Sequence, residues 1–118
     1  MLDAQGRQVS KLAESDLTKF NELGLKKVEA FTFTSADGKT RLHGLLHFPS
    51  NFDPTKKYPL LVSNYGGPET NEFRETFVYP SSLTEYGFLI ASVDGRNAAG
   101  KGKVIMDALY GKIGYAEM

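Results

Sequence analysis

The sequence contains no cysteine. Disulfide bonds, thiolate nucleophiles and cysteine-based metal sites are therefore excluded, although the compartment is not fixed by this absence. Neither charge is in excess, since 14 Lys and Arg balance 14 Asp and Glu. Without a basic surface field, nucleic acid and anionic lipid are not expected as partners.

Long apolar runs are also missing. No stretch approaches the roughly 20 residues of a membrane span, and the amino-terminal residues lack the apolar core of a signal peptide. We expect a soluble chain, or a piece of a longer protein. The 118 residues, 41% of them hydrophobic and 24% charged, suit one globular domain or part of one.

Residues 1–27 differ in character from the rest. A turn at 3–6 leads into a predicted strand over 7–12. A short helix follows, capped by Ser15 or Asp16, with apolar residues at helical spacing: Leu17, Phe20 and Leu23. One strand and one small helix cannot bury a core, so this segment is interpreted as a tail or linker.

From Val28 onwards the pattern is β-rich. A strand at 28–33, a turn at 36–39 and a returning strand over 41–48 predict a hairpin. Alternation places two sets of side chains on opposite faces of the returning strand: Leu42, Gly44 and Leu46 on one, His43, Leu45 and His47 on the other.

Two short apolar strands follow, at 58–64 and 88–93, with predicted helices at 81–86 and 103–110. Because these strands are continuously apolar, we expect helices to cover both faces of a parallel pair. The fold class is therefore α/β, with an opening hairpin followed by strand, helix, strand and helix.

The first apolar strand runs into Tyr65-Gly66-Gly67-Pro68. Glycines permit close approach of the backbone, so a ligand could lie against this turn. The local pattern by itself favours a plainer interpretation, in which the tyrosine packs in a tight turn.

Three other candidate sites are not expected to function. His43 and His47 share a strand face but have no third metal ligand. The segment 95–102 resembles a phosphate-binding loop, yet Gly102 stands where the pattern needs Ser or Thr. Three carboxylates after the tyrosine are interpreted as a solvated face: Glu69, Glu72 and Glu75.

Several motifs occur in one order along the chain: Lys57-Tyr58-Pro59-Leu60-Leu61-Val62, Tyr65-Gly66-Gly67-Pro68, Tyr86-Gly87-Phe88, Val93-Asp94-Gly95-Arg96 and Asp107-Ala108-Leu109-Tyr110-Gly111. From Val28 to the end the sequence resembles the opening of the catalytic domain in serine peptidases of the prolyl oligopeptidase family, and within it the dipeptidyl peptidase IV-like branch. The loop at 97–99 departs from that family, which more often has glycine and serine there.

The resemblance implies a domain assignment. Residues 28–118 would form the N-terminal portion of an α/β-hydrolase sheet, incomplete here because it precedes the nucleophile. Residues 1–27 would be the end of a preceding β-propeller and the link between the domains. The half-sheet is expected to self-associate through its exposed edge.

The resemblance also implies a role for Tyr65, whose hydroxyl would contribute to the oxyanion hole, supported by the loop Gly66, Gly67 and Pro68. The catalytic triad has no candidates. No Gly-x-Ser-x-Gly is present, and His43 and His47 precede the place of the nucleophile.

We therefore expect a piece of a dipeptidyl-peptidase-like enzyme that acts through an acyl-enzyme, needs no cofactor or metal and takes peptide substrates when complete, but is inactive as this chain alone. Export of the complete protein is a further expectation from relatives. Two alternatives stay open: another α/β-hydrolase, acting on esters or acylated peptides, and a non-catalytic interaction module.

Overall fold

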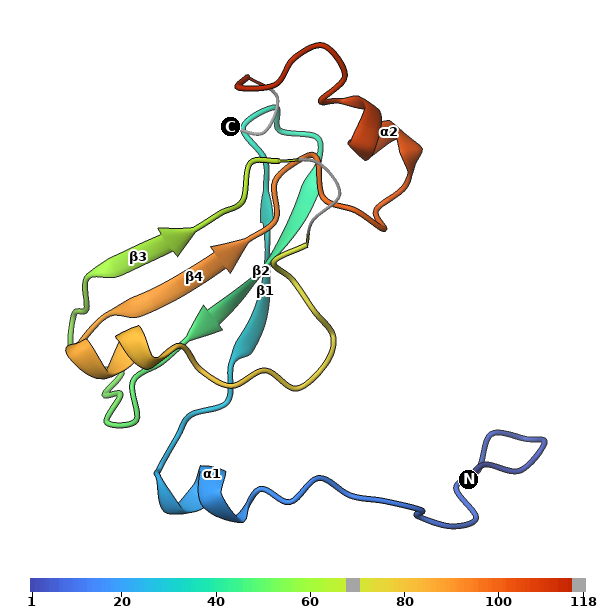
Figure 1. Ribbon diagram of the computed structural model, residues 1–118, viewed down its shortest axis with the longest axis vertical. Helices are drawn as coiled ribbons and strands as arrows, with labels where there is room; N and C mark the ends of the chain where they lie inside the picture. Colours follow the sequence, from blue (N-terminus) through green and yellow to red (C-terminus); the bar gives the residue numbers. More distant parts are fainter. Residues whose placement is uncertain (68–70, 116–118) are drawn as a thin grey trace.

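The computed structural model describes residues 1–67 and 71–115. Four strands form one mixed sheet in the order β1-β2-β4-β3 (Figure 1). Their bounds are β1 Glu29–Thr34, β2 Arg41–His47, β3 Leu60–Ser63 and β4 Leu89–Val93. β2 is antiparallel to both β1 and β4, whereas β3 and β4 are parallel. The predicted hairpin and parallel pair are confirmed.

The helices are short. They are α1 (Thr18–Glu22), the 3-10 helix η1 (Ser82–Tyr86) and α2 (Lys103–Asp107). The helix predicted at 81–86 is present but is a 3-10 helix, which Gly87 ends with a φ of 89°. The helix predicted at 103–110 is shorter than expected, because backbone turns replace it after Asp107.

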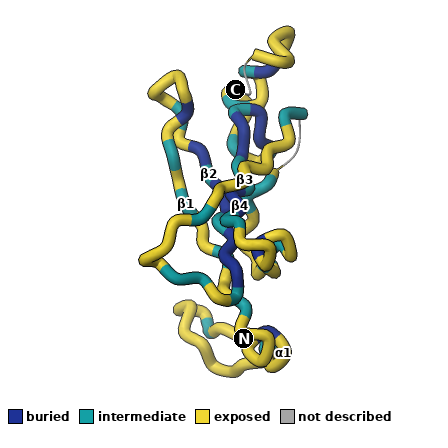
Figure 2. Tube along the Cα trace, turned by 90° about the vertical axis from the view of Figure 1, so that its left-hand side faces the viewer, coloured by how far each residue is buried: buried dark blue, intermediate teal, exposed yellow. Residues whose placement is uncertain are grey.

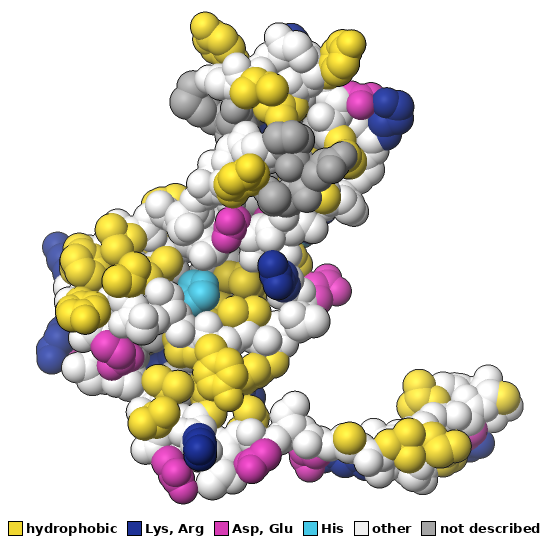
Figure 3. Space-filling model, in the orientation of Figure 1, with side chains coloured by type: hydrophobic (Ala, Val, Ile, Leu, Met, Phe, Trp, Pro, Cys, Tyr) yellow, Lys and Arg dark blue, Asp and Glu magenta, His cyan; other side chains and the backbone are white. Residues whose placement is uncertain are grey.

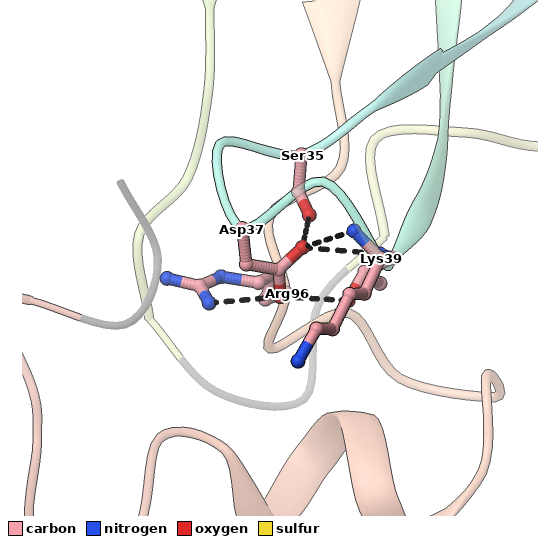
Figure 4. A network of polar contacts seen from close by, with 5 residues as sticks. Ser35, Asp37, Lys39 and Arg96 are labelled. Carbon is pink, nitrogen blue, oxygen red and sulfur yellow. Dashed lines mark hydrogen bonds and ion pairs between the residues drawn. The ribbon is translucent and has the colours of Figure 1, made fainter.

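The hairpin turn between β1 and β2 is organised by the carboxylate of Asp37 (Figure 4). It accepts hydrogen bonds from the backbone N–H groups of Lys39, at 2.8 Å, and Thr40, at 3.1 Å, and from the Ser35 hydroxyl. Arg96 Nη1 lies 3.2 Å from Asp37 Oδ2, which ties the turn to the chain after β4. These donors stabilise the ionised form and hold the pKa of Asp37 well below its ordinary value.

The buried part of the molecule lies along the two central strands (Figure 2). Leu42 and Leu45 of β2 and Ile90 and Ala91 of β4 are all at most 6% exposed. Side chains from both faces of β2 are buried. Because successive side chains of a strand point to opposite faces, other parts of the chain must pack against each face of β2.

Close packing on one face of β2 depends on Gly44. A Cβ atom at this position would lie 2.6 Å from Cζ of Phe31 and 2.9 Å from the backbone oxygen of Ser92. The Phe31 ring therefore occupies the space that any larger residue at position 44 would need.

The expectation that helices cover both faces of the apolar pair is wrong for β3. Leu60, Leu61 and Val62 are 54%, 40% and 63% exposed. Among the described residues, β4 is the one element with which β3 makes an extensive contact. A continuous apolar run indicates a strand that is suited to burial. It does not indicate whether the helices that would pack on that strand belong to the same stretch of chain.

The residues before α1 extend away from the sheet (Figure 1). The radius of gyration is accordingly 17.7 Å, against about 13 Å for a compact domain of this length. The strand predicted at 7–12 is wrong, since the described pairing there is the isolated bridge Leu2↔Gln8. Asp3 holds that bridge as a tight local turn, and a single extended segment has no neighbouring strand to pair with.

The start of α1 also differs slightly from expectation. The residue at the helix N-cap is Leu17, which makes no side-chain capping bond. Asp16, one of the two predicted caps, instead accepts a hydrogen bond from the Thr18 N–H at 2.9 Å. The helix therefore begins one residue later than a cap at Asp16 would place it.

Replacing Gly44 with alanine tests the packing against Phe31. We expect the free energy of unfolding to fall by about 1–3 kcal/mol, because the added methyl group forces Phe31 and β4 apart. Urea denaturation followed by circular dichroism measures this, with Thr32→Ala on the exposed side of β1 as the control. A loss no larger than that of the control would contradict the packing argument.

Candidate functional site

Tyr65 lies two residues beyond the end of β3, at the carboxyl end of the parallel pair. In α/β sheets this is the edge at which ligands bind. The side chain is 55% exposed and borders a cavity of about 650 Å³. Residues of β2 and β4 and the loop 71–79 complete the lining. The tyrosine therefore borders an open cavity, although its ring also packs within its own turn, against Gly67.

Gly67 permits the position of the Tyr65 ring. A Cβ atom on Gly67 would lie 2.7 Å from both Cζ and the hydroxyl oxygen of Tyr65. The ring therefore lies directly against the backbone of this glycine, and a larger residue would displace it. Gly66 is half-buried between the two. Pro68, the last residue of the predicted loop, lies outside the described residues, as does Glu69.

Asn97 fixes Gly67 from the other side. Its side-chain Nδ2 donates a hydrogen bond to the Gly67 carbonyl oxygen, and the residue is only 3% exposed. Tyr65, Gly67 and Asn97 therefore form a chain of contacts that runs from the loop after β4 to the tyrosine ring. In the sequence, Asn97 stood out only as part of the loop that departs from the resembled family. Its local pattern does not indicate that it binds Gly67, which lies 30 residues away.

Asp94 fixes the beginning of the loop 71–79. Its Oδ1 accepts hydrogen bonds from the backbone N–H groups of Glu72, at 2.9 Å, and Phe73, at 3.0 Å. The side chain is 1% exposed, and Lys101 Nζ lies 3.9 Å from Oδ2 and 5.0 Å from the centre of the Phe73 ring. Two backbone donors therefore satisfy Oδ1, whereas the buried Oδ2 accepts no hydrogen bond among the described residues and has only the nearby charge of Lys101.

The other candidates from the sequence are placed apart from one another. Lys101, the lysine of the phosphate-loop pattern, is paired with Asp94. Glu72 is half-buried and borders the cavity, whereas Glu75 is exposed. Within residues 1–67 and 71–115, no group of three or more His, Asp or Glu residues is arranged to hold a metal ion.

His43 and His47 have different partners despite sharing a strand face. His43 stacks on Phe73, with ring centres 5.2 Å apart. His47 is 6% exposed, and its Nδ1 accepts a hydrogen bond from the Ser81 N–H at 3.2 Å. An accepting Nδ1 requires the neutral imidazole with its proton on Nε2. Burial accordingly lowers the pKa of His47.

The depressed pKa of His47 makes stability depend on pH. Below the ordinary value of 6.5, the unfolded chain binds a proton at His47 more readily than the folded chain does. The contribution of neutral His47 to the free energy of unfolding is therefore complete above pH 6.5. It is lost as the pH falls towards the lower pKa of His47 in the folded chain. Urea unfolding between about pH 7.5 and pH 5.5 should show this loss, reduced in His47→Gln, which keeps an acceptor for Ser81 but does not titrate. Identical pH profiles for the two proteins would contradict the assignment.

No protein-family model matches this chain. Dipeptidyl peptidase 4 of Trichophyton equinum is 33% identical over 107 residues, which is 86% of this chain and 14% of that protein. Prolyl endopeptidase FAP of Homo sapiens is 42% identical over 73 residues, or 59% of this chain and 10% of that protein. The chain belongs to the dipeptidyl peptidase IV-like branch of the prolyl oligopeptidase family.

Two solved structures from this branch have a similar fold to this chain. A Bacteroides ovatus protein described as a dipeptidyl aminopeptidase IV matches with a TM-score of 0.64 and 32% identity, over 70% of this chain and 12% of that one. Porphyromonas gingivalis dipeptidyl peptidase 4 matches with a TM-score of 0.66 over 92% of this chain and 16% of that one. At 21% sequence identity, this match shows a similar fold and nothing further.

The chain spans only 10% to 14% of the length of the curated relatives it matches. In the part of the chain that the structure describes, no helix has the length and apolar character needed to cross a bilayer.

Proposed function

We propose that this chain supplies the oxyanion donor of a serine peptidase that cleaves peptides through an acyl-enzyme, with dipeptidyl release as the favoured specificity. Residues 28–118 are assigned to the N-terminal portion of an α/β-hydrolase sheet, and residues 1–27 to the end of a preceding β-propeller and the interdomain link. Family membership supports this assignment, as do the mixed sheet and the extended course of the first residues.

The observation that carries the proposal is the position of Tyr65. It lies at the carboxyl end of the parallel pair with its side chain open to a cavity of about 650 Å³. Acyl transfer builds negative charge on the former carbonyl oxygen of the substrate, and a hydroxyl held nearby stabilises that charge by donating a hydrogen bond. Such a donor is effective only when it is fixed beforehand, which is the role we give to Gly67 and Asn97.

The remaining catalytic groups must come from elsewhere in the complete polypeptide. A serine in a Gly-x-Ser-x-Gly turn would attack the carbonyl carbon, with a histidine taking the serine proton and an acidic residue orienting the histidine. None of these groups has a candidate in the 118 residues. We accordingly expect no peptidase activity from this chain alone, because the charge that Tyr65 would stabilise does not develop without a nucleophile.

Removing the Tyr65 hydroxyl in the complete enzyme tests the proposal. For Tyr65→Phe we expect kcat on a dipeptidyl p-nitroanilide to fall roughly 100- to 1,000-fold, with KM nearly unchanged, because the lost hydrogen bond forms mainly in the transition state. Tyr86→Phe, at a tyrosine that is 80% exposed, is the matched control. Wild-type turnover in Tyr65→Phe would overturn the role.

The same assay separates the two hydrolase alternatives. An enzyme for esters or acylated peptides would hydrolyse a p-nitrophenyl ester or an acyl-peptide but leave a dipeptidyl p-nitroanilide with a free amino terminus intact. In that case Tyr65 keeps its chemistry, since ester hydrolysis passes through the same tetrahedral intermediate. Only the substrate class would change.

We also propose that the isolated chain self-associates through β3. Three consecutive apolar residues are exposed on an outer strand, and such an edge offers unpaired backbone groups to another chain. Hydrophobic side chains are visible at the end of the sheet where β3 begins (Figure 3).

A charge on this strand should disperse the chain. We expect size-exclusion chromatography to show oligomers for the unmodified chain and a larger monomer fraction for Val62→Lys. Val104→Lys, at a residue of α2 that is 86% exposed, is the control and should leave the elution profile unchanged. A compact monomer for the unmodified chain would contradict the proposal and favour a free-standing module.

A further inference from the structure

The loop 71–79, which we call the cavity wall, lines two cavities. It borders the cavity of about 650 Å³ beside Tyr65 and also a second cavity of about 410 Å³ lined by Lys27, Val28 and Ala30. The same wall residues, 74 and 76–78, line both cavities. Because cavities border it, its position depends on the places where it is attached to the rest of the chain.

Besides the contacts of His43 and Lys101 with the Phe73 ring, three attachments hold the wall among the described residues. Asp94 binds the backbone at the start of the wall, and His47 binds the Ser81 N–H just beyond its end. Between these two points the wall is held by Phe20, which belongs to α1 in the amino-terminal segment. The second half of the wall is therefore held by a part of the chain that lies outside the sheet.

Phe20 inserts into an aromatic cluster with Phe77 and Tyr79. The ring centres of Phe20 lie 5.4 Å from Phe77 and 5.9 Å from Tyr79, with edge-on angles of 71° and 61°. Phe77 and Tyr79 are themselves 5.2 Å apart at 85°. These are the separations and angles at which aromatic pairs attract one another beyond simple burial.

Burial shows that this contact is specific to Phe20. The residue is 3% exposed, whereas Leu23, the C-cap residue that follows the same helix, is 68% exposed. A five-residue helix does not hold its shape alone in water, so α1 depends on this docking as much as the wall does. Hydrophobic side chains gather where α1 meets the sheet (Figure 3).

We propose that Phe20 is a positioning residue for substrate binding: by holding Phe77 and Tyr79, it sets the width of the cavity beside Tyr65. This rests on the proposed function of Tyr65. The segment that precedes the sheet thereby takes part in shaping the peptide-binding cavity, and movement of that segment changes how tightly a peptide fits.

Limited proteolysis of the 118-residue chain tests whether Phe20 holds the cavity wall in place, without any assay of activity. Arg74 is exposed in the middle of the wall, so trypsin cleavage after it reports how often the wall opens. We expect Phe20→Ala to raise the initial cleavage rate after Arg74 about threefold to tenfold, the range that loss of aromatic contacts allows. Cleavage after Lys57, in a separate loop, serves as the internal reference.

Two further variants separate the contact from general damage to the helix. Phe20→Leu keeps an apolar side chain and should restore most of the protection at Arg74. Leu23→Ala removes an apolar group from the same helix without touching the wall and should behave as the unmodified chain. Equal cleavage at Arg74 in all four proteins, or equal acceleration by Leu23→Ala, would overturn the proposal.

Kinetics of the complete enzyme test the substrate-binding part. In Phe20→Ala we expect KM for a dipeptidyl p-nitroanilide to rise about threefold to tenfold while kcat changes less than twofold, because binding is lost equally in the ground and transition states. A fall in kcat with KM unchanged would overturn it. Failure of Tyr65→Phe to lower kcat would remove the proposed catalytic role, yet the proteolysis result would still decide whether Phe20 holds the wall.

Discussion

The buried carboxylate of Asp94 is the interaction on which the surroundings of Tyr65 depend. A carboxylate that is 1% exposed is stable only if its charge is met, and here two backbone N–H groups of residues 72 and 73 and the amine of Lys101 meet it. The same requirement that stabilises Asp94 therefore places the beginning of the cavity wall. Loss of this carboxylate would leave the backbone N–H groups of residues 72 and 73 without their acceptor and Lys101 without its ion pair.

Asp94 is one of three anchors in four residues. Directly after β4, Asp94 binds the cavity wall, Arg96 binds Asp37 in the β1–β2 turn, and Asn97 binds the Gly67 carbonyl. β4 lies inside the sheet between β2 and β3, so the segment that leaves it can reach loops on either side. Three loops that are far apart in the sequence thus take their positions from one short stretch.

Much of the framework could be predicted from the sequence because its signals are local. The period-two pattern of β2 and the turn residues around Asp37 give the hairpin, and the apolar run at 88–93 gives β4. What local pattern could not supply is the identity of distant partners. The exposure of β3, the bond from Asn97 to Gly67 and the docking of Phe20 on Phe77 each depend on segments far away in the chain. Tyr65 itself was found through family resemblance, since its local pattern favoured a packed turn.

The anchors after β4 also determine when the site can take shape. Asp94 lies 22 residues beyond Glu72, Asn97 lies 30 beyond Gly67 and Arg96 lies 59 beyond Asp37. A chain made from its amino terminus therefore completes all three loops before it makes the residues that fix them. Closing such long segments costs chain entropy before any contact repays it, which slows their formation. The β1–β2 hairpin can form early, whereas the surroundings of Tyr65 become ordered only after residue 97 has been synthesised.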